Sequence, residues 1–277
     1  MITLIAHAKI NLFLDIMGKR DDGYHLLETV MQSVDLSDIV TVELAYSGIT
    51  VDCSDPTVPK NEENICFKAA ERFFALSGNS GGAKINIDKR IPHGAGLGGG
   101  SADAAAVLVG LNELSGQPFD EETLLKLAAQ ISADVPFCMV GGTKLCRGIG
   151  EVMSAEQPYP AACFLIVKPG FGCDTKSAYA DYDRASVPCR ERRAGEYYNV
   201  FRAIYQNDRL NAIAERLTEL GADGAELTGS GSAVFGAFSD EETAKTAAQQ
   251  FPECFTAVCK PMSRGIIIVN GQLTMDN

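Results

Sequence analysis

The chain has 277 residues and a formal net charge of −12. This length can bury a sizeable core and lies where single cores tend to divide into two domains. The acidic balance argues against nucleic acids and anionic membranes as partners, because both require a basic surface, although a local site can still bind a small anion. The apolar runs are strand-sized, too short to cross a bilayer, and the N-terminus lacks the basic region of a signal peptide.

The nine cysteines are scattered and form no C-x-x-C pair. This pattern is typical of free thiols in a reducing compartment, so we expect a cytoplasmic protein. The spacing also argues against a zinc site. No pattern in the sequence indicates an oligomeric state.

Strand-like segments dominate the first part of the chain, and Asp22-Gly23 between the first two predicts a hairpin turn. A helix follows a polar loop, with apolar residues at helical spacing and Asn64 as its N-cap. After one more strand comes an alanine-rich helix from Ser101 to about Leu114, and then a helix with an acidic first turn. The predicted strands are 2–16, 25–36, 38–45 and 83–91, and the predicted helices are 64–78, 101–114 and 119–131.

The second part of the chain starts near residues 154–162, where two prolines flank a polar segment. Before this boundary, residues 133–151 read as a turn or short helix leading into strands. After it we expect a strand, a loop over 171–179, polar helices within 195–221, and a turn and strand over 228–238. A later helix begins with a capping box of Ser239 and Glu242, and residues 255–269 form a final strand or pair. The class is α+β in two halves.

The segment Pro92–Ala102, called here the glycine loop, carries five glycines and runs directly into the alanine-rich helix. Glycine lets backbone N–H groups line a concavity without Cβ clashes. The helix start adds unpaired N–H groups and the positive end of a dipole. We therefore predict a phosphate site, where Ser101 caps the helix or faces a phosphate or Mg²⁺. A flexible connection with Ser101 as an ordinary cap is the alternative.

The glycine loop also contains G-x-G-x-x-G at Gly94, Gly96 and Gly99. A dinucleotide site needs a strand after the helix, with an acidic residue at its end. Here a second helix follows, and the acidic residues at the right distance, Asp120 and Glu121, lie at its start. A Walker A loop needs lysine before the serine, whereas this loop has glycine. The sequence therefore favours a different kind of phosphate site.

The motif "PHGAGLGGGSADAA" resembles the P-x-x-x-G-L-G-x-x-S-A loop of the galactokinase, homoserine kinase, mevalonate kinase and phosphomevalonate kinase (GHMP) superfamily. "AKINLFLDI" and "LTGSGSAVFGAF" occur in the order of that superfamily. The set "AKINLFL", "GYH", "GLGGGSA" and "ADVPF" is similar to the narrower 4-diphosphocytidyl-2-C-methyl-D-erythritol kinase family. The resemblance extends from Ala8 to Phe238.

The resemblance implies a two-domain fold, with a ribosomal-protein-S5-domain-2-like half over 1–155 and a ferredoxin-like half over 156–277. It also implies ATP-dependent phosphorylation of the 2-hydroxyl of 4-diphosphocytidyl-2-C-methyl-D-erythritol, in non-mevalonate isoprenoid synthesis. ATP and Mg²⁺ would be the cofactors, and no acidic residue matches a magnesium ligand, so phosphates and water would hold the metal. The implied ATP-binding residues are Pro92, His93, Gly94, Ala95, Gly96, Leu97, Gly98, Gly99, Gly100, Ser101 and Ala102, with Asn64 and Lys89.

Two residues match the catalytic positions of the family. Lys9 interrupts an apolar strand; by residue type alone it is either a snorkelling lysine or a cation near a transferring phosphoryl. Asp134 precedes a Val-Pro pair, so it reads as a helix N-cap. The resemblance makes Lys9 the catalytic lysine and Asp134 the carboxylate that accepts the proton of the substrate hydroxyl.

The remaining matches concern the substrate. Asn11 lies on the same strand face as Lys9. By resemblance, Tyr24 stacks on cytosine, His25 bonds its edge and Tyr179 covers the other face; Tyr24 and Tyr179 could equally be surface aromatics. Further substrate contacts implied by the resemblance are Thr175, Gly229, Ser230 and Gly231.

Two residues near the glycine loop also carry expectations. Lys89 either flanks the nucleotide or is a strand-end lysine, and Asp103 in the first helical turn is expected to face away from the phosphates. Three alternatives remain open: another kinase of the superfamily, an NAD-dependent oxidoreductase and a catalytically silent nucleotide-binding module.

Overall fold

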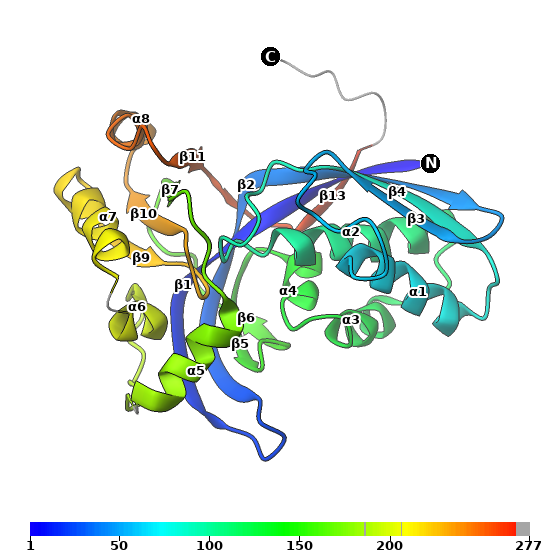
Figure 1. Cartoon of the computed structure of the whole chain (residues 1–277), viewed down its shortest axis with the longest axis horizontal. Coiled ribbons are helices and arrows are strands. Elements are labelled where there is room, and N and C mark those ends of the chain that lie inside the picture. Colours follow the sequence, from blue (N-terminus) through cyan, green and yellow to red (C-terminus); the bar gives the residue numbers. More distant parts are fainter. Residues whose placement is uncertain (186, 206, 270–277) are drawn as a thin grey trace.

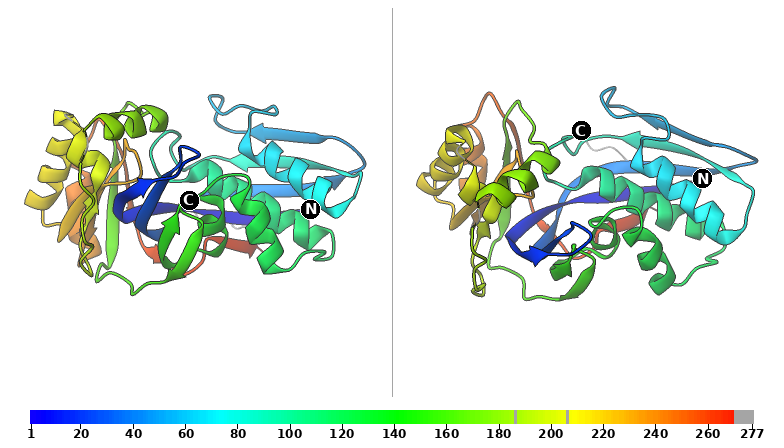
Figure 2. Two further views of the ribbon diagram at one scale, coloured as in Figure 1. Left: turned by 90° about the horizontal axis from the view of Figure 1, so that it is seen from below. Right: turned by 60° about the horizontal axis from the view of Figure 1, so that its bottom comes forward.

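The computed structural model describes residues 1–185, 187–205 and 207–269. Its strands form a nine-stranded sheet and a four-stranded sheet. Figures 1 and 2 show α1–α4 gathered at the large sheet, α6–α8 near the small sheet at the other end of the molecule, and α5 beside the hairpin of the first two strands. The predicted α+β class is therefore confirmed. No helix in the described ranges is long and apolar enough to span a membrane.

The first two strands form a long antiparallel hairpin around the predicted turn, where Gly23 has a φ of 91°. The sequence predicted two strands within 25–45, but the structure has one. The apparent break is a bulge, because Asp35 and Leu36 are left out of the ladder between the two strands. The hairpin consists of β1 (Ile2–Lys19) and β2 (His25–Ala45).

A β-α-β unit extends the large sheet. The sequence analysis missed its first strand, a short segment within a polar region, which pairs in parallel with the second. Asn64 caps the connecting helix as predicted, accepting a hydrogen bond of 2.8 Å from the N–H of Cys66. The unit comprises β3 (Ile49–Cys53), α1 (Ile65–Ser77) and β4 (Gly82–Asp88).

Three further helices lie with α1 at the large sheet. The alanine-rich helix starts at Gly99, and its N-cap is Gly98, so the prediction that Ser101 begins or caps it is wrong. A second helix follows it rather than a strand, which agrees with the argument against a dinucleotide site. These elements are α2 (Gly99–Leu114), α3 (Glu121–Ala129) and α4 (Val135–Val140), followed by β5 (Thr143–Gly148) and β6 (Val152–Ala155).

The small sheet is antiparallel, in the order β11-β7-β10-β9. Two expectations fail here. The predicted loop over 171–179 contains the start of a helix, and the cap of the last helix is Asp240 rather than Ser239. The elements are β7 (Cys163–Lys168), α5 (Thr175–Ala185), β8 (Tyr198–Asn199), α6 (Val200–Ile204), α7 (Asp208–Glu219), β9 (Gly224–Leu227), β10 (Val234–Phe238), α8 (Glu241–Ala248) and β11 (Phe255–Cys259).

The chain then returns to the large sheet. β12 (Pro261–Met262) pairs with β2, and β13 (Ile266–Val269) pairs with β1. β8 also pairs with β1, in parallel. The large sheet thus takes strands from both halves of the sequence, and the division at 155/156 remains a prediction.

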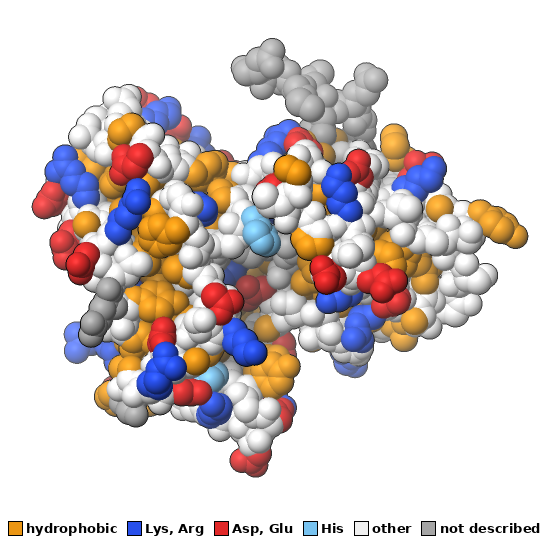
Figure 3. Space-filling model, in the orientation of Figure 1, with side chains coloured by type: hydrophobic (Ala, Val, Ile, Leu, Met, Phe, Trp, Pro, Cys, Tyr) orange, Lys and Arg blue, Asp and Glu red, His pale blue; other side chains and the backbone are white. Residues whose placement is uncertain are grey.

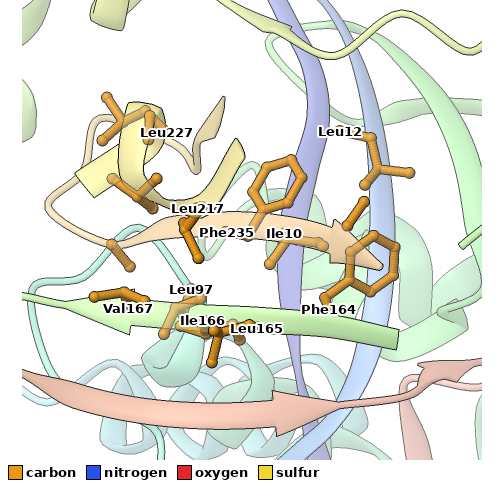
Figure 4. Close-up of a cluster of buried hydrophobic side chains, with 14 of the residues drawn as sticks. Ile10, Leu12, Leu97, Phe164, Leu165, Ile166, Val167, Leu217, Leu227 and Phe235 are labelled. Atoms are coloured by element: carbon orange, nitrogen blue, oxygen red, sulfur yellow. The ribbon is translucent and has the colours of Figure 1, made fainter. Parts of the chain in front are cut away.

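One hydrophobic cluster joins the small sheet to the large one. Figure 4 shows Ile10 and Leu12 of β1 close to Phe164 of β7 and Phe235 of β10, with Leu217 of α7 in the same cluster. All five side chains are buried, and burial of such side chains is the main favourable contribution to folding. β1 belongs to the large sheet and packs its apolar side chains against the small one, which fixes the position of Lys9.

Candidate active site

The glycine loop connects β4 to α2 and has the backbone that only glycine adopts easily. Gly94, Gly96 and Gly98 have positive φ values of 65°, 77° and 68°. No side chain caps α2, so the first-turn N–H groups stay available for an anion. A cavity of about 230 Å³ is lined by residues 92–101 with Ile65 and Lys89. This arrangement fits the phosphates of a nucleotide.

Strand β1 lies directly behind the glycine loop. The N–H of Lys9 donates to the carbonyl of Leu97 at 3.0 Å. A Cβ on Gly98 would lie 2.8 Å from Cγ of Lys9. Glycine is therefore needed at position 98 for this close approach as well as for its φ.

The Thr228–Ala233 turn supports the glycine loop from the other side. The hydroxyl of Thr228 donates to the carbonyl of Gly96 at 3.2 Å. The N–H of Ala233 donates to the carbonyl of Ala95 at 3.1 Å. A Cβ on Gly96 would lie 2.1 Å from the carbonyl oxygen of Thr228, so the two turns are in direct contact.

A buried hydrogen-bond network fixes Lys9. Its Nζ donates to Oδ1 of Asn11 at 2.7 Å, which places both side chains on one strand face as predicted. Asn11 in turn donates from Nδ2 to Thr29 at 2.9 Å and accepts from the N–H of Gly229 at 2.9 Å. Thr29 was not identified from the sequence, because threonine alternating with apolar residues is ordinary in a strand.

Asp134 lies at the start of α4 and faces Lys9. Its Oδ2 is 3.5 Å from Nζ of Lys9. Asp134 occupies the N-cap position of α4, as expected, but its side chain makes no capping hydrogen bond. The carboxylate therefore remains free for a substrate.

Lys9 and Asp134 line a cavity of about 140 Å³ together with Asn11, Gly229 and Ser230. Thr175 and Tyr179 of α5 close its other side, and Thr175 is 2.8 Å from the hydroxyl of Ser230. Gly96 and Gly98 line both this cavity and the glycine-loop cavity. The two cavities therefore adjoin each other at Gly96 and Gly98, next to Lys9.

Aromatic side chains lie at the other end, in a cavity of about 720 Å³. Tyr24, His25 and Tyr179 line it, and Asp134 and Thr175 belong to its lining and to that of the smaller cavity. Tyr24 is 60 % exposed, whereas His25 stacks on Tyr179 with ring centroids 4.8 Å apart. Burial raises the pKa of Tyr179 to about 12, so this ring stays neutral. Figure 3 shows this face hollowed between its two lobes.

Lys89 lies beneath the glycine loop as part of a buried ionic triad. Its Nζ contacts the carboxylate of Asp38 and lies 2.9 Å from Oδ2 of Asp103. Burial lowers the pKa of Lys89, but the two carboxylates outweigh it and raise that pKa overall. Asp103 does not line the cavity, as expected, and burial raises its pKa well above the usual range. The charge of Lys89 is thus taken up by two carboxylates.

Three predicted residues do not line these cavities. Both polar atoms of the Asn64 amide bond backbone groups, so only its neighbour Ile65 reaches the glycine-loop cavity. Ala102 is buried within α2, and Gly231 packs against Cys173. Within the described residues, no cluster of three or more His, Cys, Asp or Glu side chains could hold a metal.

Two family models match the chain. The one described as GHMP kinases N terminal domain matches residues 64–142, and the one described as GHMP kinases C terminal matches residues 194–257.

Curated relatives match along most of the chain. A 4-diphosphocytidyl-2-C-methyl-D-erythritol kinase of Clostridium botulinum is 39 % identical over 270 residues, covering 91 % of this chain and 96 % of the relative. One of Syntrophomonas wolfei is 40 % identical over 267 residues, covering 90 % and 94 %.

Two solved structures are similar to this chain along most of its length. A crystal structure of 4-(cytidine 5'-diphospho)-2C-methyl-D-erythritol kinase is 32 % identical with a TM-score of 0.78, covering 93 % of this chain and 99 % of that one. Homoserine kinase from Cytophaga hutchinsonii shares the fold, with 20 % identity, a TM-score of 0.74 and 97 % of each chain covered.

Proposed function

The chain belongs to the 4-diphosphocytidyl-2-C-methyl-D-erythritol kinase family of the GHMP superfamily, and we propose that its cleft transfers the γ-phosphoryl group of ATP to the 2-hydroxyl of that cytidyl compound. The observation that carries this proposal is the contact of 3.5 Å between Lys9 and Asp134. It lies where the glycine-loop cavity meets the cavity that leads to the aromatic residues. A phosphoryl donor on one side and a hydroxyl on the other would meet at this pair.

The glycine loop would hold the phosphates of ATP. Its support is the uncapped start of α2, whose N–H groups and dipole favour negative charge. Lys9 adds a buried cation at the junction. Such fixed positive groups stabilise the charge of a transferring phosphoryl at little reorganisation cost.

Asp134 would accept the proton of the attacking hydroxyl, and Lys9 would orient that hydroxyl. The carboxylate makes no capping bond, is 32 % exposed and faces the cavity, so its oxygens can reach a substrate. The Lys9 ammonium is held in one place by Asn11. Positioning and charge stabilisation supply most of the rate enhancement in phosphoryl transfer.

Tyr24, His25 and Tyr179 would bind the cytidine end of the substrate. The cavity they line is about 720 Å³, far larger than homoserine or mevalonate needs. Tyr24 offers an exposed ring face for stacking on a base. The substrate diphosphate would then lie near Gly229 and Ser230, which line the smaller cavity.

Mg²⁺ bound with ATP would supply part of the charge neutralisation at the phosphates. Because the described residues contain no cluster of three or more side chains suited to a metal, we propose that phosphates and water provide most of its ligands, with the hydroxyl of Ser101, which lines the glycine-loop cavity, as a protein ligand. We also propose a cytoplasmic enzyme, since all nine cysteines are free.

The decisive experiment measures ATP consumption with the cytidyl substrate, with homoserine, with mevalonate and with no acceptor. We expect turnover with the cytidyl substrate alone. Turnover with homoserine or mevalonate instead would assign a different kinase of the superfamily. Saturable NADH binding without ATP binding would favour the oxidoreductase alternative, and ATP binding without any turnover would favour a silent module.

A further inference from the structure

His25 has a hydrogen-bond partner that the family resemblance did not indicate. Its Nε2 lies 2.7 Å from Oδ1 of Asp183, which is on α5. Asp183 follows Tyr179 by one helical turn, so both side chains lie on the same helix face. Figure 1 shows α5 beside the β1–β2 hairpin that carries His25. The helix thus supplies both the stacking ring and the carboxylate for His25.

The carboxylate can act only as an acceptor at this position. Lys19 of β1 donates to the other oxygen of Asp183 at 2.6 Å. The hydrogen bonds from Lys19 and then His25 hold the pKa of Asp183 below its usual range. Because an ionised carboxylate has no proton to donate, Nε2 of His25 must carry the proton in this contact.

The opposite ring nitrogen is available. In a neutral imidazole with the proton on Nε2, Nδ1 is a hydrogen-bond acceptor. Nδ1 of His25 has no partner in the part of the chain that the structure describes, although the side chain is only 10 % exposed. The ring is held by its stack on Tyr179 and by an edge contact with Tyr182 at 5.9 Å. His25 lines the large cavity, and Nδ1 is its one ring nitrogen without a partner among the described residues.

We propose that Asp183 is a positioning residue that fixes the Nε2–H tautomer of His25, and that the resulting Nδ1 acceptor selects a cytosine base over uracil. The inference rests on the proposed function, since that supplies the pyrimidine. Cytosine carries an exocyclic amino group where uracil carries a carbonyl oxygen. An acceptor in the site pairs with the amino group and repels the carbonyl, and a polar group left unpaired lowers affinity.

Asp183→Asn tests this pair sharply. Lys19 can only donate, so it would keep the amide oxygen and turn the amide NH₂ towards His25. Nε2 would then have to accept, and the proton would move to Nδ1. The substitution has almost the same shape, yet it converts the acceptor that faces the base into a donor.

The first measurement is the ratio of kcat/KM for the cytidyl substrate to that for its uridyl counterpart. We expect Asp183→Asn to lower this ratio by about 10- to 100-fold, the range for one unpaired polar group, through KM for the cytidyl compound. Asp181→Asn is the matched control, because Asp181 lies on the same helix and pairs with Arg184 instead. An unchanged ratio in Asp183→Asn, or an equal loss in the control, overturns the proposal.

The second measurement needs no substrate. The ¹⁵N shifts of an imidazole distinguish its protonated nitrogen from the bare one, and the chain has only three histidines to assign. We expect Nε2–H at His25 in the wild type and Nδ1–H in Asp183→Asn; the same tautomer in both overturns the proposal. A wild type that phosphorylates neither compound would overturn the proposed function and base selection with it, whereas the spectrum still decides the tautomer.

Discussion

Nζ of Lys9 lies 3.5 Å from Oδ2 of Asp134, and the two groups are held very differently. Lys9 is buried in β1 and bonded to Asn11. The Asp134 side chain is 32 % exposed and makes no hydrogen bond to the helix that it precedes. The cation is thus fixed, and the carboxylate is free to meet a substrate.

Asp134→Asn should therefore remove catalysis and leave the fold intact. Loss of a positioned proton acceptor typically costs about 10²- to 10⁴-fold in rate. No capping hydrogen bond is lost, so the free energy of unfolding should hardly change. Steady-state kinetics, nucleotide binding and urea unfolding check this on one variant. Full turnover would remove Asp134 from the chemistry.

Asp120→Ala is the contrasting variant. Asp120 caps α3 with a hydrogen bond of 2.9 Å to the N–H of Thr123 and does not line the three cavities of the active site. Loss of such a cap costs about 0.5–2 kcal/mol of stability. We expect lower stability with unchanged kcat, the reverse of Asp134→Asn. If both variants lost activity and stability together, the distinction between cap and proton acceptor would fail.

Gly98→Ala tests the close approach of Lys9 to the glycine loop. Gly98 has a φ of 68°, and an added Cβ would lie 2.8 Å from Cγ of Lys9. The lysine or the loop must move, so we expect kcat to fall by at least about 10-fold, the effect of 1.36 kcal/mol on the barrier. Enzyme kinetics measure it directly.

Gly116→Ala provides the control at the other end of α2. Its φ is 79°, but a Cβ there would meet nothing within 4 Å. Both variants should lose about 1–2 kcal/mol of stability from the left-handed backbone, and only Gly98→Ala should lose activity. Equal kcat values for the two variants would show that the contact with Lys9 is unimportant.

The sequence predicted those helices and strands in which one face is buried along the whole element, because the apolar residues then recur at a regular spacing. The α1 pattern and its Asn64 cap are examples. The predicted loop over 171–179 covered the start of α5, because the side chains of this helix are mostly polar and only Ala178 is fully buried. Its position depends on contacts distant in sequence, such as Tyr182 with the carbonyl of Ile16. The long β2 was divided because a bulge interrupts the alternation that a strand otherwise shows.

The residues of the candidate site also divide into those that the sequence could place and those that it could not. Lys9 and Asn11 could be placed on one strand face from their spacing, and the structure confirms it. Asp183 could not be found, because its partner His25 is 158 residues away in the sequence and the helix that carries Asp183 and Tyr179 was not predicted. The role of Asp134 as a cap seemed natural from its neighbours, whereas its actual side-chain partner comes from β1.

Replacing different members of the buried triad of Lys89, Asp38 and Asp103 should lower the free energy of unfolding by different amounts. Lys89→Met leaves Asp38 and Asp103 buried together without a cation. Breaking a buried pair in this way costs about 3–5 kcal/mol. Urea unfolding at pH 7 should show this loss, with the slope m unchanged.

Asp103→Asn should be far milder. Burial raises the pKa of Asp103 well above its usual range, so a neutral amide of the same shape removes a charge that this buried position disfavours. The contact between Lys89 and Asp38 remains. We expect a change of about 1 kcal/mol or less. Equal losses in Lys89→Met and Asp103→Asn would mean that the triad does not depend on its central cation.

His7 should make the protein sensitive to mild acid. It is 4 % exposed in β1, and neither ring nitrogen has a hydrogen-bond partner among the described residues. Burial lowers the pKa of His7, and the nearby Asp35 offsets this only in part. Below about pH 6.5, His7 therefore binds a proton in the unfolded chain more readily than in the folded chain. The contribution of His7 to stability is full above that pH and is lost as the pH falls.

His7→Leu should remove this component, since leucine has a similar size and no charge to bury. We expect the free energy of unfolding to fall less between pH 7.5 and 5.5 in the variant than in the wild type, because each pKa unit of difference corresponds to about 1.4 kcal/mol. His93→Gln is the control: this histidine is exposed, so its replacement should keep the wild-type slope. Identical slopes in His7→Leu and the wild type would mean that His7 takes up its proton as readily in the folded chain as in the unfolded one.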